Sequence, residues 1–356
     1  MLKSRFPVLA LVVFIGLTSV NWTPEEAGIR LSDPKAVAQH GTSVMPVLTD
    51  AIPPGKNVLW CATFQMAWDA AAARFGRPLR LTPALKLADS LNRQPFDRRW
   101  VDEASVFTAE GVMNEDVMGR IDHGMRNLSG KKSKLAASLK KDAAPDDLVF
   151  FASLKKDLEF PQPFGKLGTW KLGKRSVPWF GFTPEHLETG PLHQQVRVHH
   201  YGGKDDFVIE LLSKTTGDQL ILAKLPALPE TPGEASRNVL KHLRADAPHA
   251  GGADLLAVPN VMTEETAEFS QLEGRSVAGT GLILRKALQT IDFQMDEKGV
   301  KLRSEAAVSF GCSVQEHVVP RLMILDPPFA LVMKRKDAPQ PFFVAWFANA
   351  DLLGRK

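Results

Sequence analysis

The sequence predicts an α+β fold in which N-terminal helices pack on a large mixed or antiparallel central sheet, with additional β-sheets beside it. Predicted helices come first along the chain and predicted strands dominate later, a pattern typical of α+β proteins. The 356 residues include 44 Lys and Arg against 40 Asp and Glu, with 44% hydrophobic and 24% charged residues. This composition is typical of a globular protein. The net charge of +4 is too dilute to indicate a nucleic-acid partner.

The N-terminal segment has the character of an export signal. Lys3 and Arg5 precede an uncharged apolar run from Phe6 to Val20, which is shorter than the roughly 20 residues that a bilayer-spanning helix needs. We interpret residues 1–24 as a signal peptide, with an uncleaved N-terminal anchor as the alternative. The protein is therefore expected outside the cytoplasm, secreted or periplasmic, and at a membrane only if this segment is retained.

The rest of the chain divides into an arm and one large unit. Residues 25–56 are rich in Pro, Gly, Asp, Ser and Thr and are expected to form a linker or loosely packed arm, followed by a single domain over 57–354 in a monomer. Helices are expected at 61–75 and over much of the polar stretch 82–147, whose lysines we interpret as a solvated helix face. Strands are expected at 57–60, 148–154, 196–201, 207–212, 219–225, 329–333 and 342–347. The apolar run 148–154 is typical of a central strand covered on both faces.

One hairpin can be predicted in register. If Asp296 and Gly299 close a four-residue turn, Met295 lies opposite Val300 and Phe293 opposite Leu302. One face then carries the apolar residues Ile291, Phe293, Met295, Val300, Leu302, Ala306, Val308 and Phe310. The other face carries Asp292, Gln294, Lys301, Arg303 and Glu305. A slip by one residue would bury Lys301 and Arg303, so the pattern specifies this register strongly.

From this hairpin onward and in several other segments, the chain resembles the serpin family. The turn at 296–299 followed by Ser304-Glu305-Ala306-Ala307 is similar to the hinge from which the family's reactive-centre loop leaves a central strand. Further similarities lie at 57–75, 147–164, 258–260, 325–333 and 342–347, in the family's order. The chain is thus identified as a divergent serpin-like domain, and its fold class as serpin-like α+β.

The resemblance implies a suicide-substrate protease inhibitor, in which a cleaved loop inserts as a new strand into the main sheet. The hinge residues that it implies are Glu297, Lys298, Gly299, Val300, Leu302, Ser304, Ala306 and Val308. The candidate bait region is Gly311, Cys312, Ser313 and Val314. The partner would be a serine or cysteine protease engaged by residues 300–319, or an unknown protein ligand in a non-inhibitory member.

Two readings of function therefore stay open. Bulky Leu302 and charged Arg303 are expected to slow insertion, which favours, by a slight margin, a non-inhibitory and non-enzymatic protein over a true inhibitor. A distant alternative is a cysteine hydrolase that uses Cys61 at a helix N-terminus, where a thiol pKa can be lowered. We expect no cofactor and no metal, because neighbouring His199 and His200 alternate across a strand.

Overall fold

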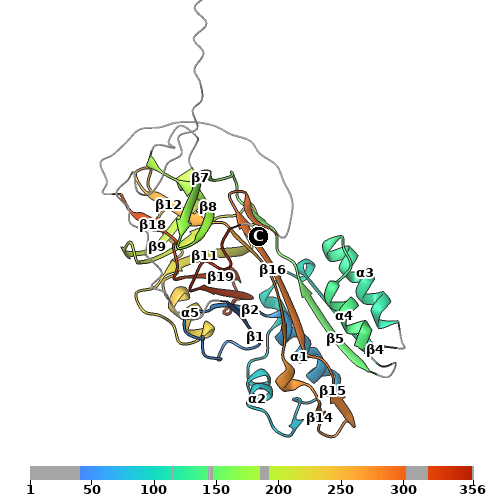
Figure 1. The fold of residues 1–356 in the computed structure, drawn as a ribbon. Helices are drawn as coiled ribbons and strands as arrows, with labels where there is room; N and C mark the ends of the chain where they lie inside the picture. The colour runs from blue at the N-terminus through green and yellow to red at the C-terminus, as the bar shows by residue number, and fades with distance from the viewer. Residues whose placement is uncertain are drawn as a thin grey trace, which may run out of the picture.

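The structure, a computed structural model, describes residues 41–113, 116–142, 144, 147–184, 192–301 and 320–354 (Figure 1). These residues form mixed sheets and helices, which confirms the predicted α+β class. The α-helices are α1 (Thr63–Arg74), α2 (Lys86–Arg93), α3 (Val117–Ser129), α4 (Lys134–Asp142) and α5 (Pro232–Leu240).

The largest sheet has seven strands among the described residues. Its order is β1 (Thr42–Met45), β2 (Asn57–Cys61), β20 (Phe343–Phe347), β19 (Phe329–Arg335), β11 (Asp218–Lys224), β10 (Asp206–Leu211) and β9 (Val196–Gly203). The predicted meander 196–225 is present as β9–β10–β11, and the predicted apolar hairpin as β19–β20. All residues of β2 and β20 are buried, as expected for strands covered on both faces.

Strand β1 corrects one expectation. It lies within 25–56, where the sequence predicts a loosely packed arm, yet Thr42–Met45 pairs in parallel with β2. A turn-rich connection joins β1 to its partner β2. Val47, which lies in this connection just after β1, is 2% exposed. Hydrogen bonds to β2 and burial on the sheet therefore order a segment whose composition is that of a loop.

The remaining strands form four smaller sheets. One four-stranded sheet has the order β18 (Leu322–Ile324), β12 (Leu255–Pro259), β8 (Arg175–Phe182), β7 (Gly165–Leu172). The other has the order β13 (Val261–Glu268), β16 (Leu288–Asp296), β17 (Gly299–Lys301), β6 (Leu158–Glu159). A three-stranded sheet contains β15 (Leu282–Leu284), β14 (Arg275–Val277) and β3 (Leu81–Thr82), and a two-stranded ribbon contains β4 (Val106–Val112) and β5 (Leu148–Leu154).

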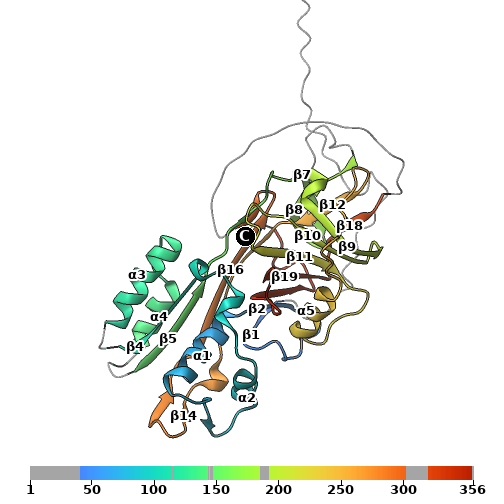
Figure 2. The same ribbon diagram turned by 180° about the vertical axis from the view of Figure 1, so that it is seen from behind.

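The ribbon β4–β5 forms one flank of the molecule together with α3 and α4, and the seven-stranded sheet forms the other (Figures 1 and 2). Long strand β16 runs between the two flanks in both views. Val149 and Phe151 of β5 pack in a cluster with α3 and α4, whereas Phe150 packs toward α1. One face of β5 is therefore covered as expected, whereas the face that carries Phe150 is only half-buried.

The central position predicted for β5 is wrong for the described residues, because β5 pairs there with β4 alone. Strand β4 is a second difference, because it lies within a stretch that the sequence predicts to be helical. Helix α1 packs mainly against β5 and β16, and α5 packs against β19 and β20 of the seven-stranded sheet. Within the described part of the chain, no helix is long and apolar enough to cross a membrane.

Candidate functional site

The predicted hinge turn joins β16 to β17 in the expected register. Met295 lies opposite Val300 and Asp296 opposite Gly299, which confirms the pairing derived from the sequence. The side chain of Asp296 accepts a hydrogen bond from the backbone N–H of Lys298 at 2.9 Å, as an Asp at the first position of a tight turn commonly does. Met295 is 1% exposed and Val300 is fully buried.

Strand β6 holds the other side of β17. Val300 pairs with Leu158 and Gly299 with Glu159. Gly299 has a φ of +155°, and a Cβ atom at this position would lie 2.3 Å from the carbonyl oxygen of Leu158. Only glycine allows this approach without a shift of backbone, so β17 is fixed between two strands.

Two phenylalanines hold the turn through backbone hydrogen bonds. The N–H of Phe160 donates to the carbonyl of Lys298 at 3.0 Å, and the N–H of Phe164 donates to the carbonyl of Glu297 at 2.7 Å. The two rings pack edge to face with centroids 4.9 Å apart, and both residues are buried. The carboxylate of Glu297 lies 3.3 Å from the Lys166 ammonium group and is 13% exposed.

A cavity of about 710 Å³ continues from the hinge between β5 and β16. Both strands line it along their length, with α1 residues such as Phe64 and Trp68 also in its wall. Only Gln294–Asp296 of β16 pairs with β17, so on this side Leu288–Phe293 has no strand partner among the described residues. The edge of β5 away from β4 is likewise unpaired in the described chain.

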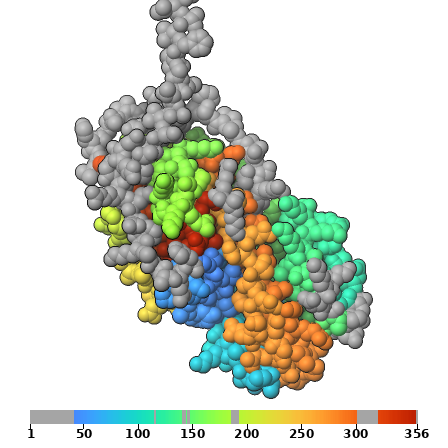
Figure 3. Space-filling view, in the orientation of Figure 1, coloured from blue at the N-terminus to red at the C-terminus, as the bar shows by residue number. Residues whose placement is uncertain are grey.

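Two ion pairs join the walls of this cavity, one exposed and one with a half-buried carboxylate. Lys134 of α4 lies 2.5 Å from Glu264 of β13, and Arg285 lies 2.5 Å from Asp147. Figure 3 shows the orange surface of the β13–β16 region beside the green surface of the α3–α4 flank. Exposed ion pairs contribute only about 0–1 kcal/mol each, so the pair of Lys134 with Glu264 contributes little to holding the walls together.

A buried ion pair lies just after the C-terminal end of β5. Lys156 is 2.7 Å from Asp218 at the start of β11, with the two side chains 5% and 10% exposed. The Lys156 ammonium group also lies 5.4 Å from the ring centroid of Phe342, just before β20. Because Lys156 lines the cavity, it ties the cavity wall to the seven-stranded sheet.

The structure brings together Glu297, Lys298, Gly299 and Val300, four of the predicted hinge residues. The sequence does not predict Leu158 or Lys166 at this site, and it indicates Phe160 and Phe164 only through the family resemblance. The reason is that all four contact the turn across more than 130 positions of the chain, where no local pattern links them. The other predicted hinge and bait residues lie outside the described residues: Leu302, Ser304, Ala306, Val308, Gly311, Cys312, Ser313 and Val314.

The site lacks the features expected of a cysteine nucleophile at Cys61. This residue ends β2 and is a free, buried cysteine. Burial raises the pKa of the Cys61 thiol and outweighs the hydrogen bonds from Thr63. The lowered thiol pKa on which the hydrolase alternative depends is therefore a wrong expectation.

The described residues also contain no group of His, Cys, Asp and Glu side chains suited to a metal ion.

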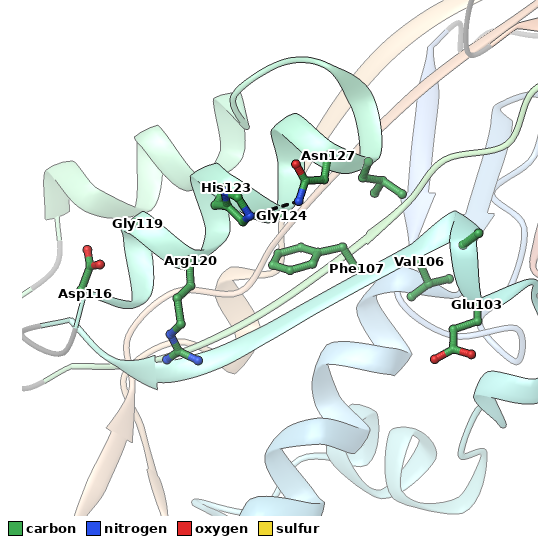
Figure 4. A pocket seen from close by; sticks show the side chains of 11 residues that line it. Glu103, Val106, Phe107, Asp116, Gly119, Arg120, His123, Gly124 and Asn127 are labelled. Carbon is green, nitrogen blue, oxygen red and sulfur yellow. Dashed lines mark hydrogen bonds between the residues drawn. The ribbon is translucent and has the colours of Figure 1, made fainter.

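A second hollow, of about 650 Å³, lies between β4 and α3 (Figure 4). The ring of Phe107 packs against Gly124, where a Cβ atom would lie 2.1 Å from the ring. The side chains of His123 and Asn127 are hydrogen-bonded to each other at 3.1 Å. None of the hinge residues lines this hollow, so it is separate from the candidate site.

Comparisons identify the fold. No family model and no curated protein matches the sequence. A solved structure described as a tumour suppressing serpin is similar with a TM-score of 0.50 and 11% identity, over 83% of this chain and 93% of that chain. Maspin has a TM-score of 0.49 at 12% identity, over 83% and 93% of the two chains. Serpin48 of the insect Tenebrio molitor has a TM-score of 0.45 at 14% identity, over 82% and 92%.

The protein therefore has an α+β fold with a strand-flanked cavity beside the tight turn that joins β16 to β17. More specifically, its fold is serpin-like, as the sequence resemblance implied.

Proposed function

We propose that the protein is a non-enzymatic protease inhibitor that works by strand insertion. The observation that carries the proposal is the cavity that begins where β17 ends and is flanked by two strand edges without a strand partner among the described residues. Each such edge presents unpaired backbone N–H and C=O groups, which an added strand can satisfy. Residues 302–308 directly follow β17 in the sequence, and the proposal assigns the added strand to them.

The observed register of β16 with β17 supports one particular pairing for the inserted strand. Extending the pairing of Met295 with Val300 sets Ile291 opposite Ser304 and Gln289 opposite Ala306. Inward positions along β16 are buried, with Ile291 6% and Phe293 4% exposed. Leu302, Ser304 and Ala306 then enter an apolar layer, and Arg303 lies beside exposed Asp292, where opposite charges attract.

The target is a serine or cysteine protease that cleaves within residues 311–314. The experiment mixes the purified chain with a panel of both protease classes and looks for a covalent complex that survives denaturing electrophoresis. Such a complex supports the proposal. Turnover of the chain as a simple substrate by every protease, with no complex, contradicts it.

A second candidate is a non-inhibitory binding protein. Leu302 and Arg303 favour it, because inhibition requires insertion to outrun hydrolysis of the acyl-enzyme and bulky or charged residues slow insertion. In that case the hinge and cavity persist as a stable scaffold, and cleavage of the chain leaves its melting temperature unchanged.

Export is part of the same proposal. It is supported by Lys3 and Arg5 ahead of the apolar run 6–20. Mass determination of the protein isolated from its host compartment tests it: a first residue near position 20–25 supports cleavage and release. A chain retaining residues 1–24 in the membrane fraction supports the anchor instead.

A further inference from the structure

We propose that the cavity between β5 and β16 also binds an amphipathic organic anion, a long-chain carboxylate with a hydroxyl group on its apolar body. This inference concerns the free protein and does not depend on protease inhibition. It assigns a small-molecule ligand to a space that the proposed function leaves to a strand.

The part of the cavity that is lined by α1 is aromatic and apolar. Phe64, Trp68, Phe75 and Phe150 line it, together with Leu284. These side chains belong to one hydrophobic cluster, in which the rings of Phe75 and Phe150 meet edge to face with centroids 6.3 Å apart. A volume of about 710 Å³ suits an organic ligand, since such pockets commonly measure about 300–1,000 Å³.

Gln289 supplies a specific polar contact. Its side-chain amide nitrogen donates to the Cys61 carbonyl and to Thr63 Oγ1, each at 2.9 Å. These acceptors fix the orientation of the amide, because a flipped amide would face its oxygen toward the Cys61 carbonyl. The Oε1 atom is then a buried acceptor with no hydrogen-bond partner among the described residues, on a side chain that lines the cavity.

An unpaired buried acceptor is unfavourable, and a donor from a ligand removes this cost. A hydroxyl group on an apolar chain provides such a donor. The chemistry at Gln289 therefore favours a hydroxylated ligand over a plain hydrocarbon chain.

The rim of the cavity is basic. Seven Lys and Arg side chains line the cavity against three Asp and Glu side chains. Lys132, Lys134, Lys156, Arg285 and Lys286 have ion-pair partners. Lys131 and Lys155 have none in the described part of the chain, so they are the amines that receive a carboxylate.

Binding of hydroxystearate, with its hydroxyl in mid-chain, to the full protein tests the inference by calorimetry and by tryptophan fluorescence. We expect one molecule per chain. Stearate should bind about fivefold more weakly, because one hydrogen bond of about 1 kcal/mol is missing. The methyl ester of hydroxystearate should also bind more weakly, since it lacks the charge.

Matched variants locate the site. Ala67→Phe places a ring in the cavity from α1 and should abolish binding, whereas Ala73→Phe, at an exposed position of the same helix, should not. Lys155→Glu should weaken binding at least about tenfold through charge repulsion, with exposed Lys171→Glu as the control. Gln289→Met should make hydroxystearate and stearate bind equally, a result that a general loss of stability does not produce.

Equal binding by wild type and Ala67→Phe would overturn the inference, as would a stoichiometry well above one or the absence of binding. No protease enters these measurements. Failure here therefore leaves the inhibitor proposal standing, and failure of the inhibitor proposal leaves ligand binding intact.

Discussion

The backbone of Gly299 lies directly against the carbonyl group of Leu158, so close that a Cβ atom on Gly299 would be 2.3 Å from the Leu158 oxygen. This contact seats β17 against β6 while β16 holds its other edge. Strand β17, from which the proposed inserting segment continues, is thus fixed between β16 and β6 before any insertion.

Replacement of this glycine should destabilise the protein. Gly299→Ala forces either a backbone shift or a strained conformation at a φ of +155°, and we expect a loss of about 1–3 kcal/mol in the free energy of unfolding. Urea unfolding measures it. Gly217→Ala is the control, because a Cβ atom there meets nothing within 4 Å; equal effects of the two changes would contradict the close approach.

The buried Lys156–Asp218 ion pair should be sensitive to removal of one partner. Lys156→Met leaves the Asp218 carboxylate buried without its cation, and we expect a loss of about 3–5 kcal/mol. The double variant Lys156→Met with Asp218→Leu should lose less than the sum of the single changes. Chemical denaturation of all four proteins completes the cycle, with exposed Lys204→Met as the control. Strict additivity would show that the two groups do not interact.

Glu210 should make stability depend on acidic pH. Arg244 N–H donates to His199 Nδ1, so His199 Nε2 carries the proton that Glu210 accepts at 3.1 Å. Burial acts to raise the pKa of Glu210, but the hydrogen bonds from His199 and Gln219 together hold that pKa below its ordinary 4.5. A depressed folded pKa means that the carboxylate contributes stability above pH 4.5, which is lost as the pH falls through the folded pKa.

We therefore expect Glu210→Gln to be less stable than wild type at neutral pH, with a difference that shrinks in acid. Urea unfolding across the range from neutral pH to about pH 3 checks this. Exposed Glu230→Gln is the control. A difference that stays constant with pH would show that folding does not lower the pKa of Glu210.

The insertion register makes a paired prediction for neighbouring alanines. Ala306→Arg places a charge on the inward face of the inserted strand, where a buried unpaired charge is strongly unfavourable, and should abolish inhibition. Ala307→Arg places the same charge on the outward face and should retain it. Val300 is unsuitable for this test, because it is already fully buried beside β6 and a charge there would disrupt the native fold. Equal inhibition by both alanine variants would show that the register is wrong.

The sequence predicts the hairpin β16–β17 well because its register depends on neighbouring residues alone: a short turn and a strict alternation of apolar and polar side chains. Strands β2, β19 and β20 are also predictable, since continuous apolar runs such as Phe343–Phe347 fit a doubly covered strand.

Strands β1 and β4 are not predictable in the same way. Val106–Val112 contains Thr, Glu and Gly and is only partly buried after Val106, so its partner β5, more than 35 positions later, decides its conformation. The cavity depends on the separation of β5 from β16, a tertiary relationship with no local sequence signal. The contacts of Phe160 and Phe164 with the hinge carbonyls are backbone hydrogen bonds, which side-chain patterns do not encode.

Thermal unfolding before and after limited proteolysis, with the cut site mapped by mass spectrometry, tests the central proposal most directly. If the segment after β17 enters the cavity, a cut within about residues 308–319 should raise the melting temperature by tens of degrees, because a new strand satisfies the edges of β5 and β16. A cut at the same place with an unchanged or lower melting temperature would contradict strand insertion and favour the non-inhibitory scaffold.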